Sequence, residues 1–286
     1  MEHFLESKDR LNERQFHIAV KRLADSLGYG TDRSPYLGSG IEYVQSRLYQ
    51  IGDPIKSIDW RVTARIGKVF IKEYESPKQL PVYLLIDTSA SMTVSSVSLS
   101  KYALALQIAG GLAFASLDRI SPVGVIGVGE STFRITPSLS RIQILQWLHR
   151  LRRYRLDERT TLGQKLKELA PSLPSRALLI VLSDLHDPSA PTALKLMAQR
   201  HDCVVLQLRD PSETAVRGAG FFRGQEAETG ESFVTLGKRV MLNQESLHDQ
   251  LKKAQIDHLL LQTDRKIEHT LRQFFQMRGL AGKGAR

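Results

Sequence analysis

Four apolar runs, separated by stretches of helical periodicity, constrain the fold of this 286-residue chain more than any other feature. The runs read LPVYLLID from Leu80, PVGVIGVG from Pro122, ALLIVLS from Ala177 and DCVVLQL from Asp202. Strands that are apolar along their whole length are buried on both faces, as in a parallel sheet. Between the runs, apolar spacing predicts helices over residues 98–117, 141–153, 162–169 and 191–200. Strands that alternate with such helices form right-handed crossovers, so the sequence predicts an α/β fold with a doubly wound, mostly parallel sheet.

The segments on either side of these runs have a different pattern. Residues 12–27 have helical spacing, residues 36–75 have the glycines and alternation of short strands, and STFRITP adds a strand through Gly129. After DCVVLQL, which we expect to be the last strand of the sheet, the turn at Glu228-Thr229-Gly230 predicts a hairpin. Residues 244–277 predict one or two amphipathic helices. We therefore divide the chain into an N-terminal helix with a β-rich accessory segment (1–77), a central α/β domain (78–210), and a hairpin with C-terminal helices (211–286).

Cysteine and signal content restrict the class of protein. The single cysteine, Cys203, excludes an internal disulfide and a zinc site made of thiolates. The N-terminal residues lack the apolar stretch of a secretory signal, and the apolar run at 102–117 is shorter than the roughly 20 residues that span a bilayer. We expect a cytoplasmic protein without a transmembrane segment, and peripheral contact with a membrane stays open.

The net charge of +10 is concentrated in two stretches. Residues 141–159 and residues 265–286 each carry six basic side chains against two and one acidic side chains, respectively. An acidic partner or a nucleic acid would explain this charge. Neither stretch contains a recognisable nucleic-acid module, so we favour a solvated helix face plus a C-terminal tail and expect no nucleic-acid partner.

The strongest chemical feature is the turn Asp87-Thr-Ser89-Ala-Ser91, directly after the first apolar run. Strand ends of this kind form the ligand crevice of an open α/β sheet. A carboxylate and two hydroxyls at this spacing can converge on a hard cation such as Mg²⁺. Asp184 ends ALLIVLSD and belongs to the same edge if the two strands are neighbours. Thr160 and Thr161 supply a further hydroxyl or, alternatively, cap the helix that follows.

These residues resemble the metal-ion-dependent adhesion site of von Willebrand factor A domains. The resemblance places Asp87, Ser89, Ser91, Thr160 and Asp184 at the metal positions, and Thr160 is preferred because Thr-Thr-Leu-Gly163 aligns with the family's Thr-x-x-Gly. Thr161 remains an alternative. The family's sites imply Mg²⁺, with Mn²⁺ as a substitute, and one coordination position left open for a partner's carboxylate. Such a metal binds a partner and is not a catalyst.

The segment before the first apolar run carries motifs that resemble one particular family. Its motifs are Arg47-Leu-Tyr-Gln-Ile-Gly52-Asp53, Ile58-Asp59-Trp60-Arg61, Ala64-Arg65 and Lys72-Glu73. Together with residues up to 236, these motifs resemble the bacterial family called domain of unknown function 58. The family implies an adaptor for a MoxR-type AAA+ ATPase, or for that ATPase's protein substrates, and does not fix an oligomeric state. Some relatives carry N-terminal transmembrane helices.

Other interpretations of these residues and of their neighbours remain open. Asp87 and Asp184 could serve a metal-dependent hydrolase or a phosphoryl-transfer enzyme, although no further phosphate-binding set or catalytic signature is evident. His186 follows Asp184 closely, and we expect it in a surface loop or behind the metal ligands because Mg²⁺ rarely takes imidazole. For the preceding segment we favour a structural role, with a turn at Gly52, Trp60 packed under the sheet and Arg65 paired with an acid. A docking surface for the ATPase is the alternative.

Overall fold

The computed structural model describes residues 13–28, 42–53, 55–75, 80–154, 158–173, 176–213, 221–225, 232–236 and 244–280. The central sheet has six strands, namely β3 (Val82–Ile86), β4 (Val123–Val128), β5 (Thr132–Ser138), β6 (Leu178–Ser183), β7 (Asp202–Arg209) and β10 (Asp257–Gln262). Their spatial order is β10-β7-β6-β3-β4-β5, and every pair is parallel except β4 with the edge strand β5. The chain order runs outward in both directions from β3. This arrangement confirms the predicted doubly wound, mostly parallel α/β fold.

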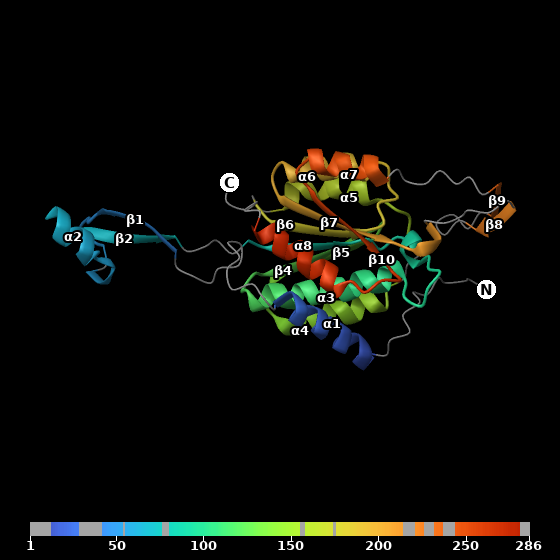
Figure 1. The fold of residues 1–286 in the computed structure, drawn as a ribbon, viewed down its shortest axis with the longest axis horizontal. Helices are drawn as coiled ribbons and strands as arrows, with labels where there is room; N and C mark the ends of the chain where they lie inside the picture. The colour runs from blue at the N-terminus through green and yellow to red at the C-terminus, as the bar shows by residue number, and fades with distance from the viewer. Residues whose placement is uncertain are drawn as a thin grey trace.

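Helices cover both faces of the sheet (Figure 1). They are α1 (Glu13–Gly28), α3 (Lys101–Asp118), α4 (Arg141–Arg152), α5 (Leu162–Leu169), α6 (Ala190–Ala198), α7 (Gln244–Lys253) and α8 (Glu268–Leu280). Side chains of α1, α3, α4 and α8 form one hydrophobic cluster with the sheet, and side chains of α5, α6 and α7 form the other. Because both faces are covered, strands β3 and β4 are buried at every position, which explains their unbroken apolar sequence.

The long apolar run at 102–117 forms α3, which is buried around most of its circumference. Two glycines allow α1 to approach it closely. A Cβ atom added at Gly110 would lie 2.9 Å from Val20, and one added at Gly111 would lie 2.7 Å from Leu23. The run is therefore a core helix, as its length predicts. Among the described residues, no helix combines the length and apolar content needed to span a membrane.

The C-terminal part differs from the prediction. Residues 244–277 contain two helices, but β10 lies between them and pairs in parallel with β7 from Asp257 to Gln262. The expectation that β7 is the last strand of the sheet is therefore wrong. Gln255 adopts a left-handed backbone with φ of 59° after α7, and this conformation stops the helix before the apolar run of β10. The run is short and half-buried at the sheet edge, so its apolar residues also satisfy helical spacing.

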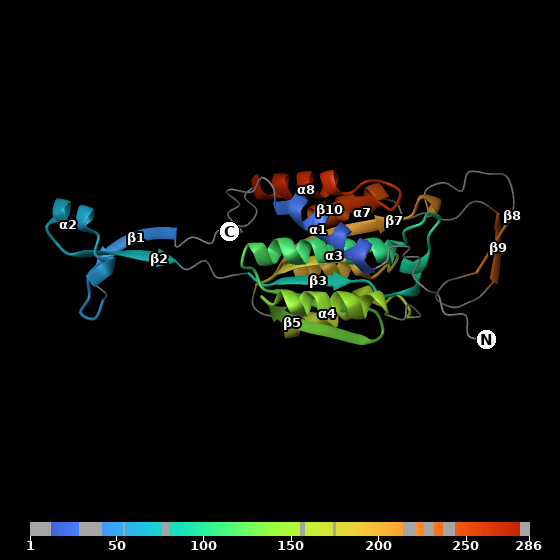
Figure 2. The same cartoon turned by 90° about the horizontal axis from the view of Figure 1, so that it is seen from below.

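The segment before the sheet forms a separate small unit of β1 (Glu42–Leu48), α2 (Trp60–Ile66) and β2 (Phe70–Glu75). Strands β1 and β2 pair antiparallel, and Figures 1 and 2 both draw this unit at one end of the molecule, away from the sheet. The turn at Gly52 is present, with φ of 109°. Trp60, however, is 67% exposed, so its predicted packing under the sheet is wrong. Arg65 is exposed as well.

The predicted hairpin after β7 is also present. Its strands are β8 (Phe221–Gln225) and β9 (Ser232–Leu236), which pair antiparallel. The turn expected at 228–230 lies outside the described residues.

Candidate functional site

The two predicted strand-end aspartates lie at one edge of the sheet. Strands β3 and β6 are neighbours, Ile86 is in register with Leu182, and the Asp87 amide donates to the Leu182 carbonyl at 2.9 Å. Asp87 follows β3 directly, and Asp184 follows β6. Both side chains are buried, with 0% and 1% of their surface exposed. The topology therefore brings together two carboxylates that are 97 positions apart in sequence.

The turn after β3 folds around the Asp87 carboxylate. Oδ1 of Asp87 accepts hydrogen bonds from the Ser89 amide at 3.0 Å and from the Ser89 hydroxyl at 2.6 Å. Oδ2 accepts from the hydroxyl of Ser183 at 2.5 Å. The Ser89 and Ser91 hydroxyl oxygens are 3.0 Å apart, and Ser91 is half-buried. Asp87, Ser89 and Ser91 thus converge as predicted from their spacing, and Ser183 is an additional member that the sequence pattern did not identify.

The electrostatics of the two carboxylates differ. Burial, reinforced by the negative charge of Asp184, raises the pKa of Asp87 to about 6. Burial also acts to raise the pKa of Asp184, but Lys101 and His186 together outweigh it and hold that pKa below its usual value. Two neighbouring buried carboxylates cannot both ionise without a large free-energy cost unless a cation offsets their charge. This edge of the sheet is therefore a favourable place for a cation.

One such cation is Lys101, at the start of α3. Its side chain is buried, and Nζ lies 2.8 Å from Asp184 Oδ2 and also binds the Glu213 carboxylate. The attraction of Asp184 and Glu213 raises the pKa of Lys101 even though burial opposes it. Sequence analysis missed this lysine because a single basic residue at the start of a helix carries no signal of its own.

Asp184, His186 and Glu213 form a group that could hold a metal ion, because one ligand atom from each lies within 4.8 Å of the others. His186 Nδ1 is 3.2 Å from Asp184 Oδ2, so His186 stands next to the strand-end carboxylate. Lys101 binds both carboxylates of this group, so a metal ion there would compete with the ammonium for the same oxygens.

The loop that starts at Glu158 and carries Thr160 and Thr161 lies beside the turn after β3. The backbones of Ser89 and Glu158 form an isolated parallel β-bridge, and the Ala90 amide donates to the Glu158 carbonyl at 2.8 Å. Thr161 stands at the N-cap of α5, yet its side chain makes no capping bond. Asp187 accepts from the Gly163 amide at 2.7 Å instead. The alternative that the Thr161 hydroxyl caps the helix is therefore wrong.

The Thr161 hydroxyl bears on whether a divalent cation fits. Its Oγ1 is buried and has no hydrogen-bond partner among the described residues. An unpaired buried hydroxyl is costly, and a metal ion aimed at it would satisfy it. Thr160, the preferred ligand by resemblance, is half-buried in the same loop. Carboxylate and hydroxyl oxygens dominate this edge, and they are the donors that Mg²⁺ prefers, so the residues fit a hard divalent cation.

Glu158 is a further buried carboxylate near the turn. It accepts hydrogen bonds from the Thr88 hydroxyl at 3.1 Å and from the Tyr154 hydroxyl at 2.8 Å. The absence of a side chain at Gly129 makes room for it, because a Cβ atom there would lie 1.8 Å from Glu158 Oε2. In the sequence, Glu158 is only one of two acidic residues in a basic stretch. Its hydrogen bond with Thr88, which is 70 residues away, cannot be predicted from that pattern.

Comparisons with known proteins give a family, two distant relatives and a similar crystal structure. Residues 45–257 match the family described as "Protein of unknown function DUF58". The chain is 25% identical over 222 residues to uncharacterized protein Rv1480 of Mycobacterium tuberculosis and to uncharacterized protein Mb1516 of Mycobacterium bovis, covering 76% of this chain and 70% of each relative. The crystal structure of conserved hypothetical protein BatB from Bacteroides thetaiotaomicron is similar with a TM-score of 0.47 and 19% identity, covering 71% of this chain and 100% of that chain. The family match spans well over half of the residues, and the chain belongs to the DUF58 family.

Proposed function

We propose that this chain is a non-enzymatic interaction protein that binds an acidic side chain of a protein partner through a divalent cation. The observation that carries the proposal is the convergence of Asp87, Ser89, Ser91 and Asp184 at one edge of the sheet. This edge is the place where open α/β sheets bind ligands.

The residues of this edge would contribute two kinds of oxygen ligand to the cation. Asp87 and Asp184 supply negative charge, and the hydroxyls of Ser89, Ser91 and a threonine supply neutral oxygens. When bound, Mg²⁺ would supply a positive charge that attracts a carboxylate oxygen of the partner. The unpaired hydroxyl of Thr161 supports this residue as the threonine ligand. Thr160, which the resemblance favours, remains the alternative.

The partner must reach the site from solvent. Asp87 and Ser89 are fully buried, whereas Ser91 is half-buried and the His186 side chain is 40% exposed. The partner's carboxylate would therefore approach between the Ser91 turn and the His186 loop. The resemblance stated above implies a MoxR-type AAA+ ATPase, or one of its protein substrates, as that partner.

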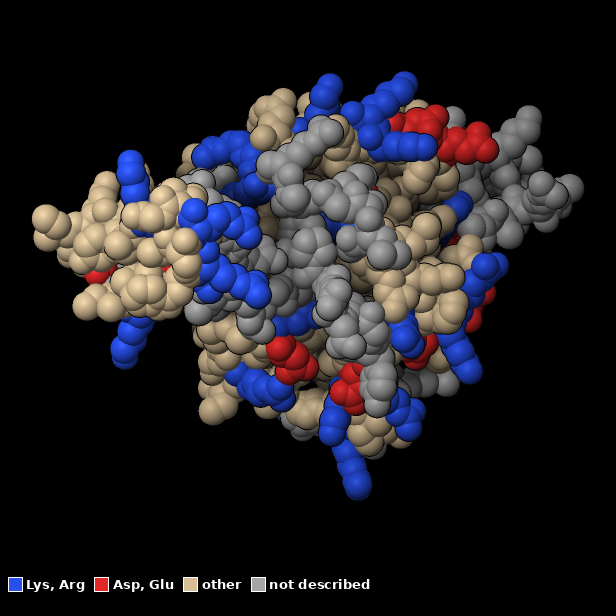
Figure 3. Space-filling model, turned by 60° about the vertical axis from the view of Figure 1, so that its left-hand side comes forward, with Lys and Arg blue, Asp and Glu red and all other residues tan. Residues whose placement is uncertain are grey.

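The contacts of the basic segments within the chain weigh against the nucleic-acid alternative. In α4, Arg150 lies 5.0 Å from the Phe133 ring centre and Arg152 lies 4.5 Å from the Phe16 ring centre. Arg278 of α8 binds Asp202 and Asp257. These arginines have partners within the chain. Among the coloured residues of the face in Figure 3, Lys and Arg are dispersed rather than joined into one patch.

The test measures binding of the full chain to the purified MoxR-type ATPase of the same organism. Asp87→Asn keeps the shape of the side chain but removes a charge, and Ser91→Ala removes a half-buried hydroxyl. We expect each change to weaken binding at least tenfold. Variants are preferable to a chelator here because the ATPase needs Mg²⁺ itself.

The matched control is Asp118→Asn, which removes an exposed carboxylate at the other end of α3. It should bind the ATPase like the wild type. Equal affinity of wild type, Asp87→Asn and Ser91→Ala would contradict the proposal. Turnover of a phosphate ester that depends on Asp87 would instead favour the metal-dependent enzyme.

A further inference from the structure

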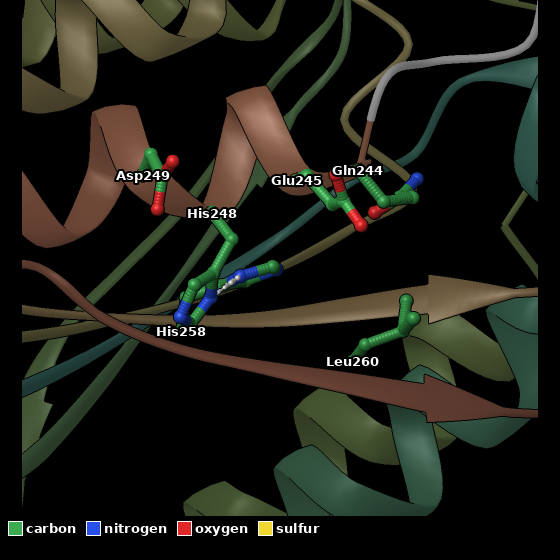
Figure 4. Close-up of a pocket in the computed structure, with 6 residues that line it drawn as sticks. All are labelled: Gln244, Glu245, His248, Asp249, His258 and Leu260. Carbon is green, nitrogen blue, oxygen red and sulfur yellow. Dashed lines mark hydrogen bonds between the residues drawn. The ribbon is translucent and has the colours of Figure 1, made fainter.

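A second cluster of metal-ligating side chains lies at the edge strand β10, which is next to β7, and on helix α7. His248 of α7 and His258 of β10 are in contact at the wall of a pocket of about 560 Å³, which is also lined by Gln244, Glu245, Asp249 and Leu260. Figure 4 shows the His248 ring pointing from the helix down to the His258 ring on the strand. Their Nδ1 atoms are 3.1 Å apart. Two ring nitrogens from different elements of the fold thus lie close enough at the pocket wall to contact the same atom.

The hydrogen bonds behind His258 fix the tautomer of its ring. Buried Gln207 uses its amide nitrogen to donate to the Asp184 carbonyl at 3.3 Å. Its Oε1 is therefore the atom that lies 3.0 Å from His258 Nε2, so the His258 Nε2–H donates to it. The lone pair of His258 is then on Nδ1, directed at His248, which donates its own Nδ1–H in the absence of a metal ion.

This arrangement has the features of a metal-binding histidine. Such a histidine typically donates its second ring N–H to an oxygen acceptor, and this contact orients the ring and increases its basicity. Gln207 provides that acceptor and is itself held by a backbone carbonyl. Burial, together with the neighbouring His248, lowers the pKa of His258 to about 4, so its ring is neutral near pH 7 and available as a ligand.

Distance and charge also suit a transition metal. Zn–N bonds of about 2.0–2.1 Å at a tetrahedral angle separate two ligand nitrogens by roughly 3.3 Å. The observed 3.1 Å needs only a small opening of the ring pair and a tautomer change of His248, in which its ring proton moves from Nδ1 to Nε2 and leaves the Nδ1 lone pair free. The carboxylates of Glu245 and Asp249 line the same pocket and add negative charge. Imidazole is a ligand for Zn²⁺ and similar ions rather than for Mg²⁺.

We propose that His248 and His258 form a binding site for a transition-metal ion of the Zn²⁺ class, with Nδ1 of each ring as ligand and the remaining positions open to water or to an added ligand. The site shares no ligand with the Asp87 edge, to which Gln207 connects it only through the Asp184 carbonyl, and it requires a different kind of ion.

The experiment titrates the untagged, metal-free full chain with Zn²⁺ by calorimetry, in excess Mg²⁺ so that hard-ion sites are saturated. We expect one Zn²⁺ to bind, and we expect His248→Gln and His258→Gln each to weaken it at least tenfold. His248 is exposed, so its variant folds even if the His258 change perturbs the sheet edge. Gln207→Leu should weaken Zn²⁺ by about tenfold through loss of ring orientation.

Two control variants locate the ion. His269→Gln removes an exposed histidine of α8 and should leave Zn²⁺ affinity unchanged. His186→Gln removes the imidazole of the Asp184 group and should also leave it unchanged. Absence of Zn²⁺ binding by the wild type, undiminished binding by His248→Gln, or loss of binding on His186→Gln would overturn the assignment.

Discussion

The sheet edge buries charged side chains, whereas the β1–α2–β2 unit exposes apolar ones. At the edge, Asp87, Lys101 and Asp184 are each at most 1% exposed. In the unit, Ile55 and Trp60 are 72% and 67% exposed. Buried charges are costly and are retained only where partners or function compensate for them. The comparison teaches that substitutions at the edge should affect folding and binding together, whereas those in the unit should leave the sheet domain folded.

The largest expected effect is on stability, from Lys101→Met. This change leaves the buried carboxylate of Asp184 and the half-buried carboxylate of Glu213 without their ammonium partner. Removal of one partner from a buried ion pair costs about 3–5 kcal/mol. Urea denaturation should show this loss in the free energy of unfolding of the sheet domain.

Arg47→Met is the corresponding change in the unit, where Arg47 binds Asp53 with 35% of its side chain exposed. Exposed ion pairs contribute little, so the transition of the sheet domain should not move. Equal losses for Lys101→Met and Arg47→Met would show that the two regions do not differ as described.

A second prediction compares the pH dependence of one carboxyl from each region in metal-free protein. Burial and then Asp184 raise the pKa of Asp87 from 3.8 to about 6, so the native state holds the extra proton between these values. Its contribution to stability is present below pH 3.8 and is lost as the pH rises through 6. Hydrogen bonds from Arg47 and from the Gln50 amide lower the pKa of Asp53. Its contribution is therefore present above 3.8 and is lost as the pH falls below that value.

Carbon-13 NMR titration of the carboxyl groups measures both midpoints directly, and Asp87→Asn and Asp53→Asn assign the signals. We expect a midpoint near 6 for Asp87 and one below 3.8 for Asp53. A midpoint of Asp87 at or below 3.8 would mean that the edge is more solvated than the structure shows.

The smallest effect on stability is expected from Trp60→Phe, because surface substitutions typically stay within about 0.5 kcal/mol. The chain has two tryptophans, one in each region, since Trp147 of α4 is 2% exposed. Iodide should quench the fluorescence of Trp60 in the Trp147→Phe variant and leave Trp147 unquenched in the Trp60→Phe variant. Protection of Trp60 from iodide would show that its ring is covered.

The fold was largely predictable because local patterns determine it. Runs that are apolar on both faces could only be central strands, and α3 is apolar all round because both the sheet and α1 cover it. Strand β10 was missed because a short half-buried edge strand carries the same apolar spacing as a helix turn. The exposure of Trp60 was missed because large aromatic residues are usually buried.

The site was predictable where its members share a turn or a strand end. Asp87, Ser89 and Ser91 are close in sequence, and Asp184 follows from the order of the strands. Lys101 and Glu158 could not be predicted, because each acts through contacts 83 and 70 positions away that only the packed structure creates. The unpaired hydroxyl of Thr161 could not be predicted either, because a threonine before a helix normally caps that helix.

The most direct test of the central claim is calorimetric titration of the metal-free full chain with Mg²⁺, compared with Asp87→Asn and with the exposed control Asp118→Asn. The account predicts that wild type and Asp118→Asn bind one Mg²⁺ with equal affinity and that Asp87→Asn binds it at least tenfold more weakly. Mg²⁺ binding by Asp87→Asn at the wild-type affinity, or no Mg²⁺ binding by the wild type, would contradict it.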